Sequence, residues 1–536
     1  MFSGIRKREA FLRLLLSKLF LSIKRGENFK VRSAATMKNS IWGIISQAVV
    51  CVLSLFSRRV MIDTIGVEGV GLNAFLTSVI TMLSLAELGI GTAIVYHMYA
   101  PLAKGDRAQI KRLMDFYKTV YRAIAAVIVV FGLILLPFMP KMAGDTSYSP
   151  RYISLIFVLF LTQTTSSYFF TYKRSLLSAD QKQYVITLFD LGYKIFTVAA
   201  GIAVLKLTRE LAYYLVLLII STVGENVFLS KKVDKMYPYI CEKGEKLPKK
   251  ECIEIARDVK NIFVAKLSAV VTTSTDSILI NVMVGTVQTG LYSNYNIILS
   301  TLSSAVNQFA SSMRGSIGNL VASETNEHIE RVFMRLLFIM FLIGSFCASC
   351  LTGLIDPFIA LAFGKNLMLD RLTVYVCIFN LYMTAVEIPV WSMVNASGLF
   401  KADKYISLLG TAVNLSVSYF LGKTLGMAGI LIGTSCTFVI KFVLKIMLFY
   451  NKFLKRSCIK IFIKNLLFAA VTFAECAAVA AFTANVHIAN AYAEFACFAV
   501  ISAAVPIIFG CALFFKTEEF KYSVNLVKNT LTGMLK

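Results

Sequence analysis

Apolar stretches of about twenty residues recur along most of the 536-residue chain, separated by short polar segments. An apolar stretch of this length crosses the hydrocarbon core of a bilayer as one α-helix. The pattern therefore predicts an all-α polytopic membrane protein with about fourteen transmembrane helices. The predicted spans are 39–62, 69–99, 116–139, 152–177, 184–206, 210–230, 258–284, 289–320, 332–355, 371–399, 404–423, 426–449, 460–484 and 490–515.

A glycine-rich turn after the first predicted span recurs in the second half of the chain. Gly66 to Leu72 matches Gly285 to Leu291 at an offset of 219 residues. Six predicted helices per copy would leave both copies in the same orientation, related by an axis along the membrane normal. We therefore expect two pseudo-symmetric six-helix lobes and an accessory helix pair. Their predicted bounds are 39–230 and 257–450 for the lobes, 231–256 for a cytoplasmic linker, 451–516 for the accessory pair and 517–536 for a cytoplasmic tail.

The basic residues predict how the chain is oriented in the membrane. Segments and helix edges on one predicted side hold roughly 43 of the 55 Lys and Arg, and those on the other side roughly 9. Cytoplasmic loops carry the excess of Lys and Arg, so both termini are predicted to be cytoplasmic. Residues 1–38 place basic side chains around a short apolar run, which predicts an amphipathic helix on the cytoplasmic leaflet.

The composition excludes several classes of protein. Hydrophobic residues make up 57% of the chain, charged residues make up 16%, and the mean hydropathy is +0.71, which is too apolar for a soluble protein of this length. The net charge of +25 follows from the basic inner loops, and no soluble basic domain is present to bind nucleic acid. The eleven cysteines and three histidines show no spacing that predicts a metal site.

The region around the first turn carries a family resemblance. Leu83-Ser84-Leu85-Ala86-Glu87-Leu88-Gly89-Ile90-Gly91 is followed by Pro101-Leu102-Ala103 and by Asp106. This pattern resembles the first lobe of bacterial polysaccharide repeat-unit flippases of the Wzx type. They belong to the multidrug/oligosaccharidyl-lipid/polysaccharide exporter superfamily.

This resemblance implies a transporter of the bacterial cytoplasmic (inner) membrane rather than an enzyme. Its implied activity is to move an undecaprenyl-pyrophosphate-linked oligosaccharide from the inner to the outer leaflet by alternating access, for surface polysaccharide synthesis. The implied partners are the polyprenyl-pyrophosphate-linked glycan and membrane lipids. A polysaccharide polymerase and glycosyltransferases are further candidate partners, and nucleic acid is not expected.

Polar residues at helical spacing form a stripe on one face of four predicted spans, the first, second, seventh and eighth. A lipid-facing helix would not expose such a stripe, which indicates a hydrated cavity or, alternatively, hydrogen bonding between helices. Arginine and lysine bind phosphate oxygens through charged hydrogen bonds. The candidate substrate-binding residues are Arg58, Arg59, Lys266 and Arg314, with Gln47 and Asn307 as polar neighbours.

Carboxylates inside the predicted spans are candidates for gating or coupling, because ionisable groups are costly there. These candidates are Glu87, Asp190, Asp276 and Glu387, and a proton or Na⁺ is the coupling ion that they could bind. Asp190 lies four residues before Lys194, so the two side chains can neutralise each other. We also hypothesise that Arg58 or Arg59 pairs with Asp276 to close the outer side.

Two alternative functions remain open at this stage. A cation-coupled multidrug exporter of the same superfamily should have an acidic cavity, whereas the candidate Lys and Arg favour an anionic substrate. A membrane glycosyltransferase or ligase, which belongs to a different class, should carry a sizeable outer loop with catalytic residues. Every predicted outer loop is short.

Overall fold

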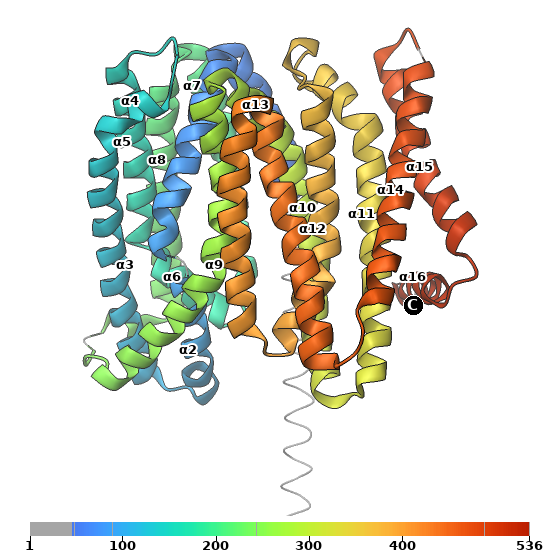
Figure 1. Cartoon of the computed structure of the whole chain (residues 1–536). Helices are drawn as coiled ribbons and strands as arrows, with labels where there is room; N and C mark the ends of the chain where they lie inside the picture. The colour runs from blue at the N-terminus through green and yellow to red at the C-terminus, as the bar shows by residue number, and fades with distance from the viewer. Residues whose placement is uncertain (1–45, 48, 88, 243, 487, 535–536) are drawn as a thin grey trace, which may run out of the picture.

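The computed structural model describes residues 46–534, except residues 48, 88, 243 and 487 (Figure 1). Helices and turns make up these described residues, and no β-strand occurs among them. The all-α prediction is therefore confirmed for this part of the chain. The amphipathic helix expected in 1–38 lies outside the described residues.

The first half of the chain contains a helical segment at 49–83 and ten further elements up to residue 241. They are η1 (Ser84–Glu87), α2 (Ile90–Lys104), α3 (Arg107–Leu135), η2 (Leu136–Phe138), α4 (Met139–Met142), α5 (Pro150–Tyr168), α6 (Thr171–Ala179), α7 (Gln183–Thr208), α8 (Leu211–Met236) and η3 (Pro238–Cys241). Two bends in this half separate η1 from α2 and α5 from α6.

The second half contains long helices and two short elements. They are α9 (Lys249–Met283), α10 (Thr286–Ser323), α11 (Asn326–Ala362), η4 (Lys365–Leu367), α12 (Arg371–Ala396), α13 (Phe400–Leu448), the π-helix η5 (Phe449–Leu454), α14 (Ile459–Asn485), α15 (Ala491–Phe514) and α16 (Glu518–Met534). Non-helical dihedral angles at Gly426 break α13 into two parts. The expected linker 231–256 is mostly helical, and the expected tail contains α16.

Eight helices among the described residues are long and apolar enough to cross a membrane, or nine if the bent pair α5–α6 counts as one span. This number is lower than the predicted fourteen for physical reasons. α9 and α10 carry polar stripes and are not among the eight, and α13 covers two predicted spans, one on each side of the break at Gly426. The structure therefore shows a polytopic α-helical membrane protein with eight or nine candidate spans.

Short polar side chains cap the starts of several helices. The side chains of Asp106, Ser149, Thr325, Asp370 and Asn490 each accept a backbone N–H from the first turn of α3, α5, α11, α12 and α15. Each bond satisfies a backbone donor that has no partner inside the helix. The caps fix where each helix begins after a short connection.

Buried apolar side chains form two large clusters. The first extends from Val60 to Ile255 in sequence, and the second from Ile280 to Phe514. We call the helices around the first cluster the first lobe and those around the second cluster the second lobe. The accessory helices α14 and α15 pack on the second lobe, mainly against α11.

One helix, α9, belongs to both lobes. Its first turns contribute Ile255 to the first cluster, and its last turns contribute Ile280 to the second. Near its start, Asp258 lies 3.0 Å from Nε2 of His97 on α2, and near its end it packs against α13. Figure 1 shows α9 passing from the lower end of the first lobe toward the upper end beside α13. The two lobes are therefore joined by a continuous helix.

The two repeated glycine turns pack directly against each other. Gly66 and Gly285 both have left-handed backbone angles, with φ of 72° and 125°, as the repeated pattern predicts for turns. A Cβ on Gly71 would lie 1.9 Å from the carbonyl oxygen of Thr286, and one on Gly290 would lie 2.3 Å from that of Val67. These contacts are equivalent at the offset of 219, so the pseudo-symmetry axis passes between the turns.

Hydrogen bonds between the lobes accompany this crossing of the turns. Thr286 Oγ1 donates to the carbonyl oxygen of Ala143 over 2.7 Å, and Asn281 Nδ2 donates to that of Met142 over 2.9 Å. Arg58 on the first helical segment donates to Ser293 on α10 over 3.2 Å. The molecule is thus closed at the end where the two turns meet.

The variants Gly71→Ala and Gly290→Ala are expected to separate the two turns, because the added methyl group would overlap a backbone oxygen that cannot rotate away. Each should lower stability by about 1–3 kcal/mol, the usual range for overpacking. Gly318→Ala on α10 is the control, since no atom lies within 4 Å of that Cβ position. Thermal unfolding of the purified variants measures the effect, and equal stability of Gly71→Ala and the control would contradict the tight crossing.

Candidate functional site

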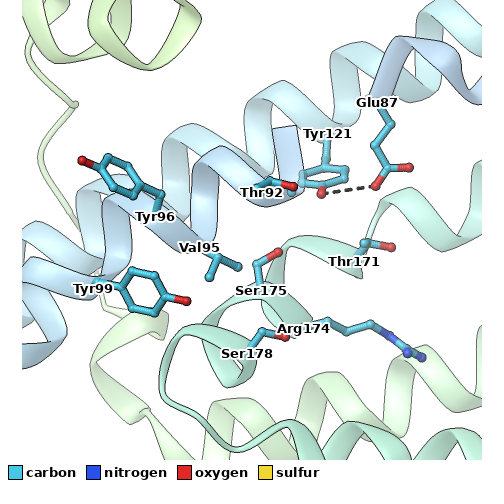
Figure 2. Close-up of a pocket in the computed structure, with 11 residues that line it drawn as sticks. Glu87, Thr92, Val95, Tyr96, Tyr99, Tyr121, Thr171, Arg174, Ser175 and Ser178 are labelled. Carbon is cyan, nitrogen blue, oxygen red and sulfur yellow. Dashed lines mark hydrogen bonds between the residues drawn. The ribbon is translucent and has the colours of Figure 1, made fainter. Parts of the chain in front are cut away.

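A cavity of about 570 Å³ lies inside the first lobe, between α2, α3 and α6 (Figure 2). Its volume falls within the range of small-ligand sites. Its walls combine hydroxyl groups, tyrosine rings and two charged side chains. The lining residues are Glu87, Gly91, Thr92, Val95, Tyr96, Tyr99, Tyr121, Thr171, Arg174, Ser175 and Ser178.

Two breaks between helices border this cavity. η1 ends at Glu87, Gly89 has a φ of 93°, and α2 starts at Ile90. The second break lies between α5 and α6, which meet at an angle of 45°. Neither α2 nor α6 has a side-chain cap at its N-terminus. Broken helices of this kind often border transporter binding sites.

The side chains divide the cavity into two ends, as Figure 2 shows. Tyr96 and Tyr99 lie at one end and are largely exposed, with 66% and 51% of their surface accessible. Glu87 and Arg174 lie at the other end, where Tyr121 donates a long hydrogen bond of 3.4 Å to Glu87. The cavity therefore has an open aromatic end and an inner charged end.

Arg174 connects three helices of the first lobe. From α6, its Nη1 donates to Asp190 on α7 over 2.6 Å, and its Nη2 donates to Glu225 on α8. Its Nε also donates to Asn226 over 3.3 Å. We expected Lys194 as the partner of Asp190, but the structure pairs Asp190 with Arg174, and Lys194 is exposed. Arginine has several donors in a planar fork, so it can bind two carboxylates at once.

The second lobe contains a comparable group of charges. Lys445 on α13 lies 3.3 Å from Glu387 on α12 and 3.3 Å from Asp403 near the start of α13. Only 4% of the Lys445 side chain is exposed. Glu387, a candidate for coupling, is therefore one of two carboxylates that neutralise a buried lysine.

Asp276, another candidate for coupling, is buried between α9 and α13. Both carboxylate oxygens lie 2.8–2.9 Å from the hydroxyl of Thr434, which has a single proton to donate. The amide of Asn414 donates to that hydroxyl over 3.0 Å, and its own Oδ1 is buried without a hydrogen-bond partner. Oxygen ligands of this kind suit a proton or a hard cation such as Na⁺. No basic side chain in the described part of the chain forms an ion pair with Asp276.

The predicted substrate residues do not gather in the first-lobe cavity. Arg58 bonds Ser293, and Arg59 bonds Asp63 over 3.0 Å and the carbonyl oxygen of Ala362 over 3.2 Å. The hypothesised pair between either arginine and Asp276 is thus not formed among the described contacts.

The remaining candidates are distributed along the bundle. Gln47 is exposed, and Asn307 is exposed on α10, with its side chain donating to the carbonyl oxygen of Ser303. Lys266 and Arg314 lie on α9 and α10, and their side chains lie outside the described part of the structure. Sequence reasoning missed Arg174, although two carboxylates, Asp190 and Glu225, were visible in the following spans.

This fold, with two lobes, broken helices and a polar cavity inside an apolar bundle, defines a multi-pass membrane transporter. The sequence model of a family described as polysaccharide biosynthesis protein matches residues 36–313, slightly more than half of the chain. The chain therefore belongs to this family of membrane transporters, and the resemblance to Wzx-type flippases is confirmed. A search of curated proteins finds no match.

Several solved structures share the fold of this chain. One is described as lipid II flippase MurJ in an inward closed conformation, with a TM-score of 0.62, 15% identity, and coverage of 89% of this chain and 98% of that one. Another is an inward-facing multidrug resistance MATE family transporter of the MOP superfamily, with a TM-score of 0.59, 15% identity, and coverage of 78% and 99%. A mutant of the Vibrio cholerae MATE transporter VcmN has a TM-score of 0.56 and 13% identity, with coverage of 79% of this chain and 99% of that one. At these identities the likeness establishes the fold.

Removing the arginine from the first-lobe cluster is expected to destabilise the protein. Arg174→Gln leaves Asp190 and Glu225 without their shared cation, which should cost about 3–5 kcal/mol. Adding Asp190→Asn and Glu225→Gln to this variant should recover much of the loss, because no charge is then left unpaired. Thermal unfolding of the purified protein measures both effects.

Arg112→Gln is the control for that experiment, because the partner of Arg112, Glu245, is 85% exposed. Such a surface pair contributes about 0–1 kcal/mol. If Arg174→Gln unfolds at the same temperature as this control, the cluster does not stabilise the first lobe.

Proposed function

We propose that the chain moves an undecaprenyl-pyrophosphate-linked oligosaccharide from the inner to the outer leaflet of a bacterial cytoplasmic membrane, for surface polysaccharide synthesis. The observation that carries this proposal is a polar cavity inside the two-lobed fold of a polysaccharide biosynthesis transporter. A MurJ structure, whose description names a lipid-linked substrate, shares the fold over most of both chains. That likeness supports a lipid-linked substrate here.

The chemistry of such a substrate explains why a transporter is needed. A pyrophosphate and its sugars would have to lose their water to cross a hydrocarbon core of about 30 Å. The polyprenyl tail is soluble in lipid and does not have to be shielded by the protein. A protein that shields the head group and leaves the tail in the bilayer solves the problem, and a polar cavity within an apolar bundle supports this role.

We propose alternating access between the two lobes as the mechanism. About fourteen spans, in two six-helix lobes plus an accessory pair, would place both termini in the cytoplasm. The turns at Gly66 and Gly285 would then lie on the outer side, which is charge-poor in sequence. Their close crossing supports a state that is closed toward the outside.

We propose that basic residues on the helices between the lobes bind the pyrophosphate. Lys266 on α9 and Arg314 on α10 are our candidates on the inner side, because both lie on polar stripes. Arg58 and Arg59 bond to the second lobe in this closed arrangement. They would be released to bind phosphate only when the turns separate.

We propose Asp276 as the site of the coupling ion, either a proton or Na⁺. Its carboxylate is buried and accepts a hydrogen bond from the hydroxyl of Thr434, and Asn414, which donates to that hydroxyl, has a buried Oδ1 without a hydrogen-bond partner. A buried carboxylate without a cation partner is costly, so binding of a proton or a cation would stabilise it. Asp276 lies on α9, which links the lobes, and binding there could therefore bias their arrangement.

Deleting the gene is expected to remove the surface polymer and to leave lipid-linked repeat units in the inner leaflet. The wild-type gene on a plasmid should restore the polymer. Leaflet-specific labelling of the extracted lipid-linked glycan measures the accumulation. Normal polymer in the deletion strain, together with sensitivity to drugs, would instead support a multidrug exporter.

The variant Asp276→Asn tests the coupling site in the same strain. Asparagine retains the shape and an acceptor for Thr434, but it cannot ionise, so export should fall about tenfold or more at normal protein levels. Asp145→Asn is the control, since Asp145 is exposed in the turn between α4 and α5. Export at the wild-type rate with Asp276→Asn would exclude Asp276 as the coupling residue.

A further inference from the structure

We propose that Glu475 on α14 binds a proton, and that the neutral carboxylic acid so formed is required for the accessory helices to pack on the second lobe. This proton site is separate from the coupling site proposed at Asp276. It does not depend on what the chain transports, because it concerns the contact between α14 and α11.

Glu475 lies in the middle of α14, on the side that faces the second lobe, and is only 1% exposed. Its Oε2 accepts a hydrogen bond of 3.5 Å from the hydroxyl of Ser349 on α11, and Ser345, one turn earlier, faces the same carboxyl group. Both serines are buried. Figure 1 shows α14 and α15 beside α11 at the edge of the second lobe. The carboxyl group is therefore enclosed between the accessory helices and the second lobe.

The helices α11, α14 and α15 meet closely next to this carboxyl group. A Cβ on Gly353 of α11 would lie 2.1 Å from Oγ of Ser502 on α15 and 3.0 Å from Cγ1 of Val479 on α14. Gly353 follows Ser349 by one turn, and Val479 follows Glu475 by one turn. Ser502 and Val479 are fully buried in this contact. Protein atoms therefore close the space beside Glu475.

No cation neutralises Glu475 in the part of the chain that the structure describes, since none of its ion pairs includes this residue. The titratable groups that face it are Tyr382 on α12 and Cys476 on α14, and both side chains are ordinarily neutral at neutral pH. The nearest charged residues of the packed helices are all more than one turn along the helix from these contacts. They are Asp356 on α11, Glu387 on α12, Lys464 on α14 and Glu494 on α15.

A proton is the ligand that fits this environment. An ionised carboxylate that is buried with hydroxyl partners and no cation is costly. A protonated carboxyl group has no charge, and it can donate its O–H while its other oxygen accepts from Ser349. A hard cation needs more oxygen ligands than one carboxyl group and two hydroxyls provide. Loss of the proton would leave a charge inside the closed contact, so α14 would have to separate from α11 to let water reach it.

Infrared difference spectroscopy of the purified full chain in lipid nanodiscs detects this proton. The C=O band of a carboxylic acid lies above the amide bands, whereas a carboxylate absorbs at lower frequency. At neutral pH, we expect wild type to show one acid band that Glu475→Gln lacks. Glu518→Gln is the matched control, because Glu518 is exposed at the start of α16 and water solvates its carboxylate. This control should lack a carboxylate band instead.

A second variant keeps the test independent of how well Glu475→Gln folds. Ser349→Ala removes the hydrogen bond to Oε2, and a C=O group that loses a hydrogen bond vibrates at higher frequency. The difference between wild type and Ser349→Ala should therefore show the acid band displaced upward. A displaced acid band arises at this position only if Glu475 is protonated.

Thermal unfolding at several pH values tests whether the proton is required for packing. The folded protein retains the proton, whereas a glutamate in the unfolded chain releases it above about pH 4.3. Unfolding then releases a proton, so the stability of wild type should fall as the pH rises above that value, until the folded protein also loses the proton. Glu475→Gln has a neutral amide at every pH. Relative to this variant, the unfolding constant of wild type should rise by up to about tenfold per pH unit.

Two results would overturn the inference. A carboxylate band that is present in wild type and missing from Glu475→Gln, or an acid band that Ser349→Ala does not displace, would reject the proton on Glu475. An acid band together with a pH-independent difference in unfolding temperature between wild type and Glu475→Gln would reject the role of the proton in packing. An acid band that Ser349→Ala displaces, together with a difference that grows with pH, supports both parts.

Discussion

An ionised side chain between membrane helices has to be neutralised where it lies, and this constraint organises both lobes. In the first lobe, Arg174 holds Asp190 and Glu225 and so ties α6 to α7 and α8. In the second, Lys445 holds Glu387 and Asp403 and ties α12 to both ends of α13. Separating such charges in a low-dielectric interior is costly, whereas apolar contacts can slide with little penalty. Each lobe is therefore expected to move as a unit, and the movement that transport requires falls on the contacts between lobes.

Those contacts differ in kind at the two ends of the molecule. At one end the repeated turns cross at Gly71 and Gly290 without intervening side chains, and hydrogen bonds from Thr286 and Asn281 hold the crossing. The lobes also share α9, which begins in the first cluster and ends in the second, beside the crossing. A crossing held by a few hydrogen bonds can open and re-form, while a shared helix keeps the lobes together as it opens. Asp276 lies on this shared helix, so protonation or ion binding at Asp276 would act on a helix that packs in both lobes.

Local patterns predicted a good part of this structure. The all-α class followed from the repeated apolar stretches, and the two turns followed from the repeated glycines, whose left-handed backbone angles only glycine adopts easily. The partners of the charges could not be predicted in this way. Arg174 reaches carboxylates 16 and 51 residues away, and helical periodicity indicates a face but not the neighbouring helix. The i, i+4 spacing favoured Lys194 for Asp190, yet a planar guanidinium on an adjacent helix offers better geometry. The break at Gly89 lay inside a predicted span, and only the glycines at 89 and 91 could have signalled it.

Transport by the purified chain alone tests the central claim most directly. The protein would be reconstituted into vesicles that contain a polyprenyl-pyrophosphate-linked oligosaccharide with a tag on its terminal sugar. A membrane-impermeant enzyme outside the vesicles would then remove the tag from every molecule that it can reach. If the chain is a lipid-linked oligosaccharide flippase, the accessible fraction should rise with time well above that of protein-free vesicles, and further when an ion gradient is imposed. An accessible fraction that stays at the protein-free level, with folded protein in the membrane, would contradict the account.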